Sequence, residues 1–347
     1  MPSRAWPLHG DTLKGRILEL LRKEKALEQP ISGIHHVTAI ASDPQRNLDF
    51  YTEVLGLRLV KRTVNFDDPG SYHLYFGDEA GTPGSILTFF AWPMGGRGSP
   101  GVGQVEVTSF SIPEPSLSYW EQRLLSARVP VERSAKRFDE EVLAFADPDG
   151  LKLEMVAHSQ SASANRAWKD ASVPAQHAIR GFYSVTLCEQ GYESTVEVLE
   201  AMGFRKAGEQ GNRFRFEVGK GGPGARLDIL CASEASYGNV AVGIVHHVAW
   251  RVADDNAQKS WRTRLVNKHL NVTPVIDRCY FHSIYFREPG GVLFELATDP
   301  PGFAIDEPTE KLGEALKLPP WLEPNRKRIE QVLPPIELHK PAKRVEA

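Results

Sequence analysis

Residues 243–299 read GIVHHVAWRVADDNAQKSWRTRLVNKHLNVTPVIDRCYFHSIYFREPGGVLFELATD, and this stretch decides the fold. It opens with a strand-like apolar run that contains His246 and His247, continues through a helix-like segment and two more strand-like segments, and ends in an apolar run with Glu295. The predicted order is β-α-β-β-β. Neutral imidazole and carboxylate both bind divalent metal ions, so this placement predicts part of a metal site. A third ligand must come from elsewhere.

The same pattern recurs along the chain and gives four copies, which we call modules 1 to 4 in sequence order. Module 1 covers about 34–92 and starts in GIHHVTAIASDPQRNLDFYTEVLGLRL. Module 2 starts in VEVTSFSIPEPSLSYWEQRLLSARV, and module 3 in GFYSVTLCEQGYESTVEVLEAMGFRKAGE. A βαβββ module has an edge strand and one bare sheet face, so it must pair with a sister module to cover them. The sequence therefore predicts an α+β fold of two paired domains.

Equivalent positions in the four modules predict which of them pair. At the start of the first strand and the middle of the last strand, the residues are, in order, His36 and Thr88, Val105 and Glu154, Tyr183 and Asp228, and His247 and Glu295. Only modules 1 and 4 together supply two histidines and a carboxylate. We therefore predict that module 1 pairs with module 4 and module 2 with module 3, and that His36, His247 and Glu295 bind a metal ion.

Strand parity selects one histidine of each pair, because neighbouring side chains on a strand point to opposite faces. His36 shares a face with Thr38, whereas His35 and His246 share faces with apolar residues. The mixed polar face should look into a cavity and the apolar face should meet the helices. His35 and His246 are therefore expected behind the ligands or as buried, hydrogen-bonded histidines, unless a twist or bulge at the start of the strand brings either one to the rim. His73 in YHLYFGD is interpreted as a structural histidine.

The chain divides into four predicted segments. Residues 1–32 are expected to be a helical extension, 33–157 to hold modules 1 and 2, 178–299 to hold modules 3 and 4, and 300–347 to be a tail. The tail is too rich in proline for another module. Its Phe303 and Trp321 are candidates either to close over the cavity as a lid or to pack as a strap.

Composition excludes several classes of protein. Among 347 residues, 41% are hydrophobic and 24% charged, and the net charge of −3 with scattered basic residues gives no reason to expect a nucleic-acid partner. The three cysteines are widely spaced, which argues against a disulfide framework. No apolar run approaches the roughly 20 residues that span a bilayer, so no membrane partner is expected. We expect a cytoplasmic homo-oligomer.

Several motifs resemble a known family. GIHHVT, VKRT, YHLYFGDEAGTPG, HAIRGFYS, GIVHHVA and PGGVLFE are similar to those of hydroquinone ring-cleaving dioxygenases in the vicinal-oxygen-chelate superfamily, which also contains glyoxalases and bleomycin resistance proteins. The similarity runs from about residue 31 to about 335. It implies the same three metal ligands as strand parity does. It also implies a set of catalytic residues, which are His35, Thr38, His246, Arg278 and Tyr285.

The resemblance implies an Fe(II)-dependent dioxygenase of aromatic compound catabolism, with Mn(II) as the alternative ion. Two histidines and a carboxylate leave up to three positions on the metal for a hydroquinone-type substrate and O2. His246 and Tyr285 have suitable types for proton transfer, and Arg278 for holding the second ring oxygen. One alternative is a glyoxalase-type isomerase or thiol transferase, which would want a fourth protein ligand where Thr88 stands. Another is a protein that sequesters an aromatic compound, which would need no metal.

Overall fold

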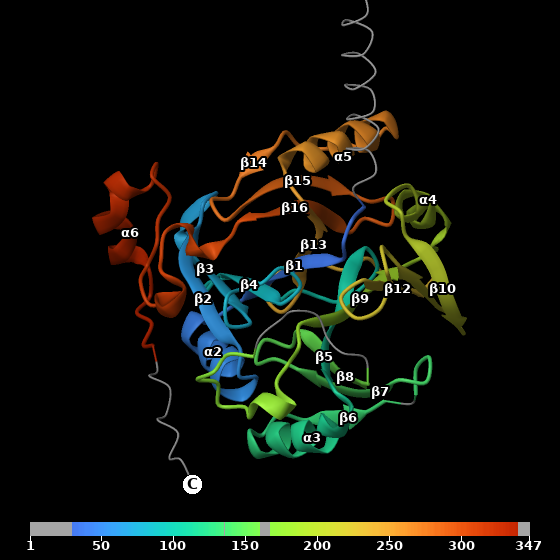
Figure 1. Cartoon of the computed structure of the whole chain (residues 1–347), viewed down its shortest axis with the longest axis horizontal. Coiled ribbons are helices and arrows are strands. Elements are labelled where there is room, and N and C mark those ends of the chain that lie inside the picture. Colours follow the sequence, from blue (N-terminus) through green and yellow to red (C-terminus); the bar gives the residue numbers. More distant parts are fainter. Residues whose placement is uncertain (1–29, 135, 160–166, 339–347) are drawn as a thin grey trace, which may run out of the picture.

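The computed structural model describes residues 30–134, 136–159 and 167–338, which contain two eight-stranded sheets (Figure 1). Residues 1–29, which carry nearly all of the predicted N-terminal helix, lie outside this part. Among the helices of the described residues, none is both long enough and apolar enough to cross a membrane.

The first sheet is built from modules 1 and 4. Its strands, in spatial order, are β14 (Ile276–Asp277), β15 (Phe281–Arg287), β16 (Leu293–Pro301), β13 (Val245–Val252), β1 (Ile34–Ala41), β4 (Ile86–Ala91), β3 (Asp68–Gly77) and β2 (Arg58–Asn65). The two modules meet where β1 and β13 pair antiparallel, with Val37 opposite Val248. Within each module the first strand pairs parallel with the last.

The second sheet repeats this arrangement with modules 2 and 3. Its strands, in spatial order, are β10 (Arg205–Gln210), β11 (Arg213–Glu217), β12 (Arg226–Cys231), β9 (Phe182–Glu189), β5 (Gln104–Pro113), β8 (Lys152–His158), β7 (Glu141–Ala146) and β6 (Val131–Arg133). The predicted pairing of module 1 with 4 and module 2 with 3 is confirmed. Each sheet thus combines one module from each of the predicted segments 33–157 and 178–299.

Each module places a helix between its first and second strands, and these helices lie at the periphery of the molecule in Figure 1. They are α2 (Pro44–Asp49), which continues as a π-helical turn (Phe50–Val54), α3 (Leu117–Ser126), α4 (Glu193–Ala201) and α5 (Asp255–Asn267). Aspartates cap two of them, because the Asp43 and Asp254 side chains accept backbone hydrogen bonds from Arg46 and Ala257.

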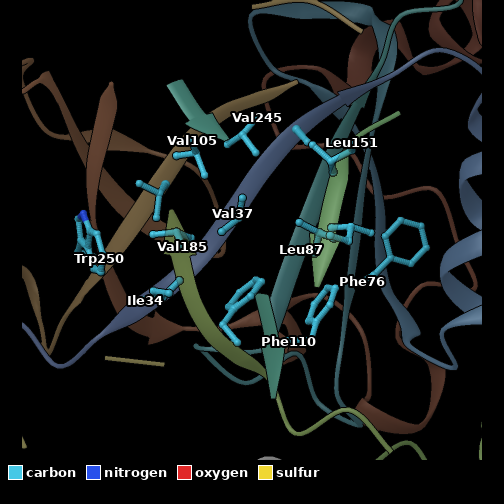
Figure 2. Close-up of a cluster of buried hydrophobic side chains, with 14 of the residues drawn as sticks. Ile34, Val37, Phe76, Leu87, Val105, Phe110, Leu151, Val185, Val245 and Trp250 are labelled. Carbon is cyan, nitrogen blue, oxygen red and sulfur yellow. The ribbon is translucent and has the colours of Figure 1, made fainter. Parts of the chain in front are cut away.

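The sheets share one hydrophobic core. Figure 2 shows Val37 of β1 and Leu87 of β4 in one cluster with Val185 of β9 and Phe110 of β5, and all four side chains are fully buried. Burial of this apolar surface from both sheets favours their association. The arrangement leaves the opposite face of the first sheet for the polar groups described below.

The C-terminal tail runs along the outer strands of the first sheet and carries α6 (Arg326–Val332) (Figure 1). Its attachment includes a fully buried lysine of β2, Lys61, whose Nζ donates to Asp306 at 2.6 Å and also to Glu307. Phe303 is buried against Tyr75, with ring centroids 5.2 Å apart.

Candidate metal centre

The structure brings the three predicted ligands together in the middle of the first sheet. His36 lies on β1, His247 on β13 and Glu295 on β16, and all three side chains are buried. The two Nε2 atoms are 3.3 Å apart, and the Oε2 of Glu295 lies 3.2 Å from the Nε2 of His36 and 3.0 Å from that of His247. It is the one group of this kind among the described residues.

Both histidine pairs lie at β-bulges, which corrects the prediction from strand parity. The pairing of β1 with β13 shifts by one residue between Ile34 and His36, and again opposite His246. A bulge places an extra residue on one strand and re-aims its side chain. As a result the Nδ1 atoms of His35 and His36 lie 3.0 Å apart instead of on opposite faces. The three predicted ligands converge, but His35 and His246 do not point away from them to an opposite, apolar face.

A proton count defines the tautomers of the first pair. The Nε2 of His35 lies 3.2 Å from the carbonyl oxygen of Thr298, which can only accept, so His35 carries its proton there. Its Nδ1 must then accept the hydrogen bond from the Nδ1 of His36. This leaves the Nε2 of His36 with a bare lone pair facing His247 and Glu295. Burial, followed by the effect of His36, lowers the pKa of His35 well below its ordinary value.

The second pair repeats this contact, with the Nδ1 atoms of His246 and His247 2.8 Å apart. Burial, together with His247, lowers the pKa of His246 to about 3, so its imidazole is neutral at neutral pH. Burial also lowers the pKa of His247. Unlike the prediction for an apolar face, His246 lines a cavity beside the three ligands.

Glu295 is held by a residue that the sequence interpretation missed. The hydroxyl of Ser283 on β15 donates to Oε1 of Glu295. Burial disfavours the charged form, yet the nearby His36 and His247 lower the pKa of Glu295 well below its ordinary value. Its Oε2 is buried without a hydrogen-bond partner. Two imidazole nitrogens and a carboxylate oxygen that converge in this way fit a divalent cation.

A cavity of about 410 Å³ opens beside these ligands. Aromatic side chains form much of its wall, including Phe66, Phe90, Trp92 and Phe281. The Phe281 ring lies 4.9 Å from the ring of His36. Such a volume, with several aromatic rings and a set of polar groups in its wall, suits a small ligand with one ring.

Arg278 and Tyr285 both line this cavity, as predicted. The Nε of Arg278 donates to the Tyr285 hydroxyl at 3.2 Å, and its Nη1 reaches Asp67 at 3.1 Å. Burial opposes its charge, but Tyr285 and Asp67 raise the pKa of Arg278. Burial, followed by Glu295, raises the pKa of Tyr285, so the phenol is protonated at neutral pH. The pair offers a positive charge and a hydroxyl donor to a ligand.

Thr38 also lines the cavity, and its hydroxyl lies 2.8 Å from that of Thr88. Thr88 in turn lies 2.8 Å from the Nε2 of His73, which the sequence interpretation had left as a structural residue. His73 lines the cavity as well. Its position on β3 could have been found by comparing the third strands of the modules, because Ser283 occupies the equivalent place on β15.

The second sheet lacks this ligand set among its described residues. In the second sheet Glu154 pairs with Ser109 and Asp228 with Thr186. In modules 1 and 4 the histidine lies two residues before the equivalent partner. The histidine-equivalent positions of the second sheet are therefore Val107 and Ser184. The predicted equivalents Val105 and Tyr183 are therefore wrong by two residues and one residue. Alignment through helix and turn landmarks misses such offsets where strands bulge.

Arginines occupy the corresponding centre of the second sheet. Arg137 donates to both carboxylate oxygens of Glu154, at 3.1 and 2.7 Å, and Arg215 donates to those of Asp228 at 2.8 and 3.0 Å. These ion pairs satisfy the carboxylates that a cation would otherwise need. The second sheet is a structural counterpart of the first.

Paired βαβββ modules of this kind define the glyoxalase-type α+β fold. A family profile described as the Glyoxalase/Bleomycin resistance protein/Dioxygenase superfamily matches residues 33–155. A Bacillus subtilis (strain 168) protein named "Putative ring-cleaving dioxygenase MhqO" is 47% identical over 307 residues, which cover 88% of this chain and 97% of that protein. The chain therefore belongs to this superfamily, and the resemblance seen in its motifs is confirmed.

Two further comparisons agree with this membership. The chlorohydroquinone/hydroquinone 1,2-dioxygenase of Sphingobium indicum is 36% identical over 306 residues, covering 86% of this chain and 94% of that protein. The crystal structure of a "putative dioxygenase" from Bacillus subtilis superposes with a TM-score of 0.86 at 46% identity, covering 90% of this chain and 99% of that chain. Glyoxalase I from Zea mays, at 14% identity and a TM-score of 0.57 over 77% and 92% of the chains, shares the fold.

Proposed function

We propose that this protein is an Fe(II)-dependent dioxygenase that cleaves a hydroquinone-type aromatic ring and inserts both atoms of O2. The observation that carries the proposal is the convergence of His36, His247 and Glu295 beside an aromatic-lined cavity. Two histidines and one carboxylate with open positions are the ligand set of non-haem Fe(II) oxygenases. The named ring-cleaving relatives support the same reaction class.

The three side chains would hold the ion through the atoms that already face one another. When bound, Fe(II) would supply positions for the ionised ring hydroxyl and for O2 side by side, and Mn(II) is the alternative ion. His35 and Ser283 contribute by orienting His36 and Glu295, which keeps the three donor atoms aimed at one point. A prearranged ligand set of this kind lowers the cost of binding the ion.

The remaining cavity residues would bind and orient the aromatic ring. The Phe281 and Phe90 side chains can hold its faces, while Arg278 and Tyr285 can meet the oxygen atom that is not bound to the metal. If His247 binds through Nε2, its Nδ1 proton is donated to His246, which leaves the proton of His246 on Nε2. His246 then acts in the cavity as a hydrogen-bond donor instead of a free base.

The tail would close the cavity on one side. The ring of Trp321 contacts that of Phe66, a cavity residue, with centroids 5.7 Å apart. The second predicted closing residue, Phe303, packs behind Tyr75 and supports the wall from outside. We infer that the tail helps to exclude water from reactive intermediates, in a cytoplasmic enzyme of aromatic compound catabolism.

The test is oxygen uptake by the Fe(II)-loaded protein with a matched panel of hydroquinones and catechols, with product identification. Oxygen consumption and a ring-opened product with hydroquinones support the proposal, and no consumption with any phenol contradicts it. A glyoxalase-type isomerase is less consistent with the structure, because Thr88, where a fourth ligand would stand, is hydrogen-bonded to Thr38 and His73. A sequestering protein would bind the aromatic compound without needing the metal.

A further inference from the structure

The first sheet carries a hydrogen-bonded chain of four side chains that ends in the cavity. The Tyr75 hydroxyl lies 2.9 Å from Nδ1 of His73, whose Nε2 lies 2.8 Å from the Thr88 hydroxyl. The Thr88 hydroxyl lies 2.8 Å from that of Thr38. Both threonines are fully buried, so their hydroxyls are shielded from hydrogen bonds to solvent.

Comparison of modules 1 and 4 shows that this hydrogen-bonded series occupies the place where module 4 orients its metal-ligand candidate Glu295. Tyr75 is opposite Thr88 on β3 and β4 just as Tyr285 is opposite Glu295 on β15 and β16. His73 therefore takes the place of Ser283, which holds Glu295. Module 1 keeps a side chain that supports the position equivalent to Glu295, although the residue there is not a metal ligand.

The geometry fixes His73 firmly. Its ring contacts those of Tyr75 and Phe90, with centroid distances of 4.1 and 4.4 Å. Tyr75 is in turn backed by Phe303 of the tail and by Tyr280, at 5.2 and 6.1 Å. These ring contacts, with hydrogen bonds at both nitrogens, restrict rotation of the His73 side chain.

We propose that Tyr75, His73 and Thr88 form a relay that holds the Thr38 hydroxyl as a hydrogen-bond donor toward the cavity. Heavy-atom distances allow two directions for the chain. A phenol is a better donor than a neutral imidazole and an imidazole nitrogen a better acceptor than a phenol, so Tyr75 donates to Nδ1. The Nε2–H of His73 then donates to the Thr88 hydroxyl, and the Thr88 hydroxyl donates to that of Thr38.

The last hydroxyl proton, that of Thr38, is left to donate into the cavity. In the reverse direction Thr38 would present only lone pairs there, and Tyr75 would be the donor. Burial, followed by the effects of His36 and His247, lowers the pKa of His73 well below its ordinary value, so the ring stays neutral and each nitrogen has one role. The relay rests on the proposed function only in that its donor would meet an oxygen of the substrate or of O2.

The direction of the relay is measurable without any turnover. In the full-length protein labelled with 15N-histidine and supplied with Zn(II), NMR should show His73 protonated at Nε2 and unprotonated at Nδ1. The signal is assigned by its loss in His73→Phe. Tyr75→Phe should shift the Nδ1 resonance, because its donor is gone. A proton on Nδ1 of His73 in the unsubstituted protein would overturn the proposal.

Coupling to Thr38 is measured by the affinity for hydroquinone under argon, in the metal-loaded protein, by calorimetry. Thr38→Val and His73→Phe should each weaken binding by about twofold to tenfold, the range for one neutral hydrogen bond, with full metal content. The double variant should bind no more weakly than Thr38→Val, since His73 acts through Thr38. Thr38→Ser, which keeps the hydroxyl, should recover the affinity lost in Thr38→Val, and the surface control Tyr237→Phe should bind normally.

Multiplicative losses in the double variant would mean that His73 acts independently of Thr38 and would overturn the relay. The two proposals fail separately. A protein that binds hydroquinone and shows this coupling, but consumes no O2, keeps the relay and loses the proposed reaction. If the unsubstituted protein does not bind hydroquinone, the proposed substrate is wrong, and the NMR result alone decides the relay.

Discussion

His36 and His247 are 211 positions apart in the sequence, yet their Nε2 atoms lie 3.3 Å apart. The two side chains come from the antiparallel strands β1 and β13, which join module 1 to module 4. Glu295 completes the cluster from β16, the parallel neighbour of β13. No metal site could form here from either module alone.

The first prediction concerns metal content. His36→Ala, His247→Ala and Glu295→Ala should each abolish stable Fe(II) binding and turnover, because each removes one of the three convergent donor atoms. Elemental analysis after gel filtration measures the bound iron. Glu154→Gln changes the equivalent position of the second sheet and should leave one iron per chain. Full iron in any of the three alanine variants would remove that residue from the ligand set.

The second prediction concerns the support of Glu295. Ser283→Ala removes the hydroxyl that donates to its Oε1. Loss of such an orienting partner typically lowers metal affinity by about 10–100-fold, which a chelator competition titration would detect. Ser109→Ala is a matched control, because the Ser109 hydroxyl donates to Glu154 at 2.7 Å in the second sheet. Equal metal affinity in both serine variants would contradict the assigned role of Ser283.

The third prediction concerns substrate choice. A catechol places two adjacent hydroxyls at the metal, whereas a hydroquinone has its second hydroxyl across the ring, where Arg278 and Tyr285 can meet it. Loss of a hydrogen bond to a charged oxygen costs about 1.5–3 kcal/mol, roughly a tenfold to hundredfold change in kcat/KM. Tyr285→Phe should therefore lower kcat/KM for hydroquinone by that factor while the iron stays bound. Rates come from an oxygen electrode.

Two results would contradict this assignment. One is faster turnover of catechol than of hydroquinone by the unsubstituted protein. The other is an unchanged kcat/KM for hydroquinone in Tyr285→Phe. Together they would indicate a ring-cleaving enzyme whose substrates are catechols, which carry two adjacent hydroxyls.

The fourth prediction concerns a buried carboxyl pair between the two sheets. The Thr195 hydroxyl lies 2.7 Å from Glu189 of β9 and 2.6 Å from Glu288, which follows β15. A hydroxyl has one proton to donate, so the second contact requires a protonated carboxyl. Burial, followed by the charge of Glu288, raises the pKa of Glu189 from 4.5 to about 8.

The sign of the pH dependence follows from this shift. The folded protein holds the Glu189 proton more tightly than the unfolded chain, so its contribution to stability is complete below pH 4.5 and is lost as the pH rises through about 8. The midpoint of thermal unfolding should fall between pH 6 and pH 9 by more in the unsubstituted protein than in Glu189→Gln. Glu197→Gln on the exposed face of α4 should behave like the unsubstituted protein. Parallel curves for all three proteins would contradict the shared proton.

Comparison of the four modules predicted their pairing and the three convergent residues, because residue types that can bind a metal are recognisable at equivalent positions of the modules. Strand parity selected the two histidines that converge on Glu295, but its assumption of opposite faces did not hold. Single-residue register shifts decide where His35 and His246 point, and such shifts depend on the partner strand. A bulge leaves no mark in the periodicity of either strand by itself.

Supporting side chains were harder to predict from sequence. Ser283 and His73 contact their partners across neighbouring strands, and neither has an unusual local pattern. The tail sequence gave no signal that Lys61, in the middle of the buried strand β2, would find its two carboxylates some 245 positions later. Such contacts depend on the tertiary structure, which brings together side chains that are far apart in the sequence.

The nesting of the modules has a consequence for biosynthesis. The second sheet comes from one continuous stretch between β5 and β12, so its strands can pair as soon as that stretch has left the ribosome. The first sheet is assembled from both ends of the chain around it. The hydrogen-bonding edge of β1 must wait for β13, more than 200 residues later, with an apolar strand exposed to aggregation in the meantime. Nascent chains that stall before β13 should therefore depend on chaperones to keep module 1 soluble.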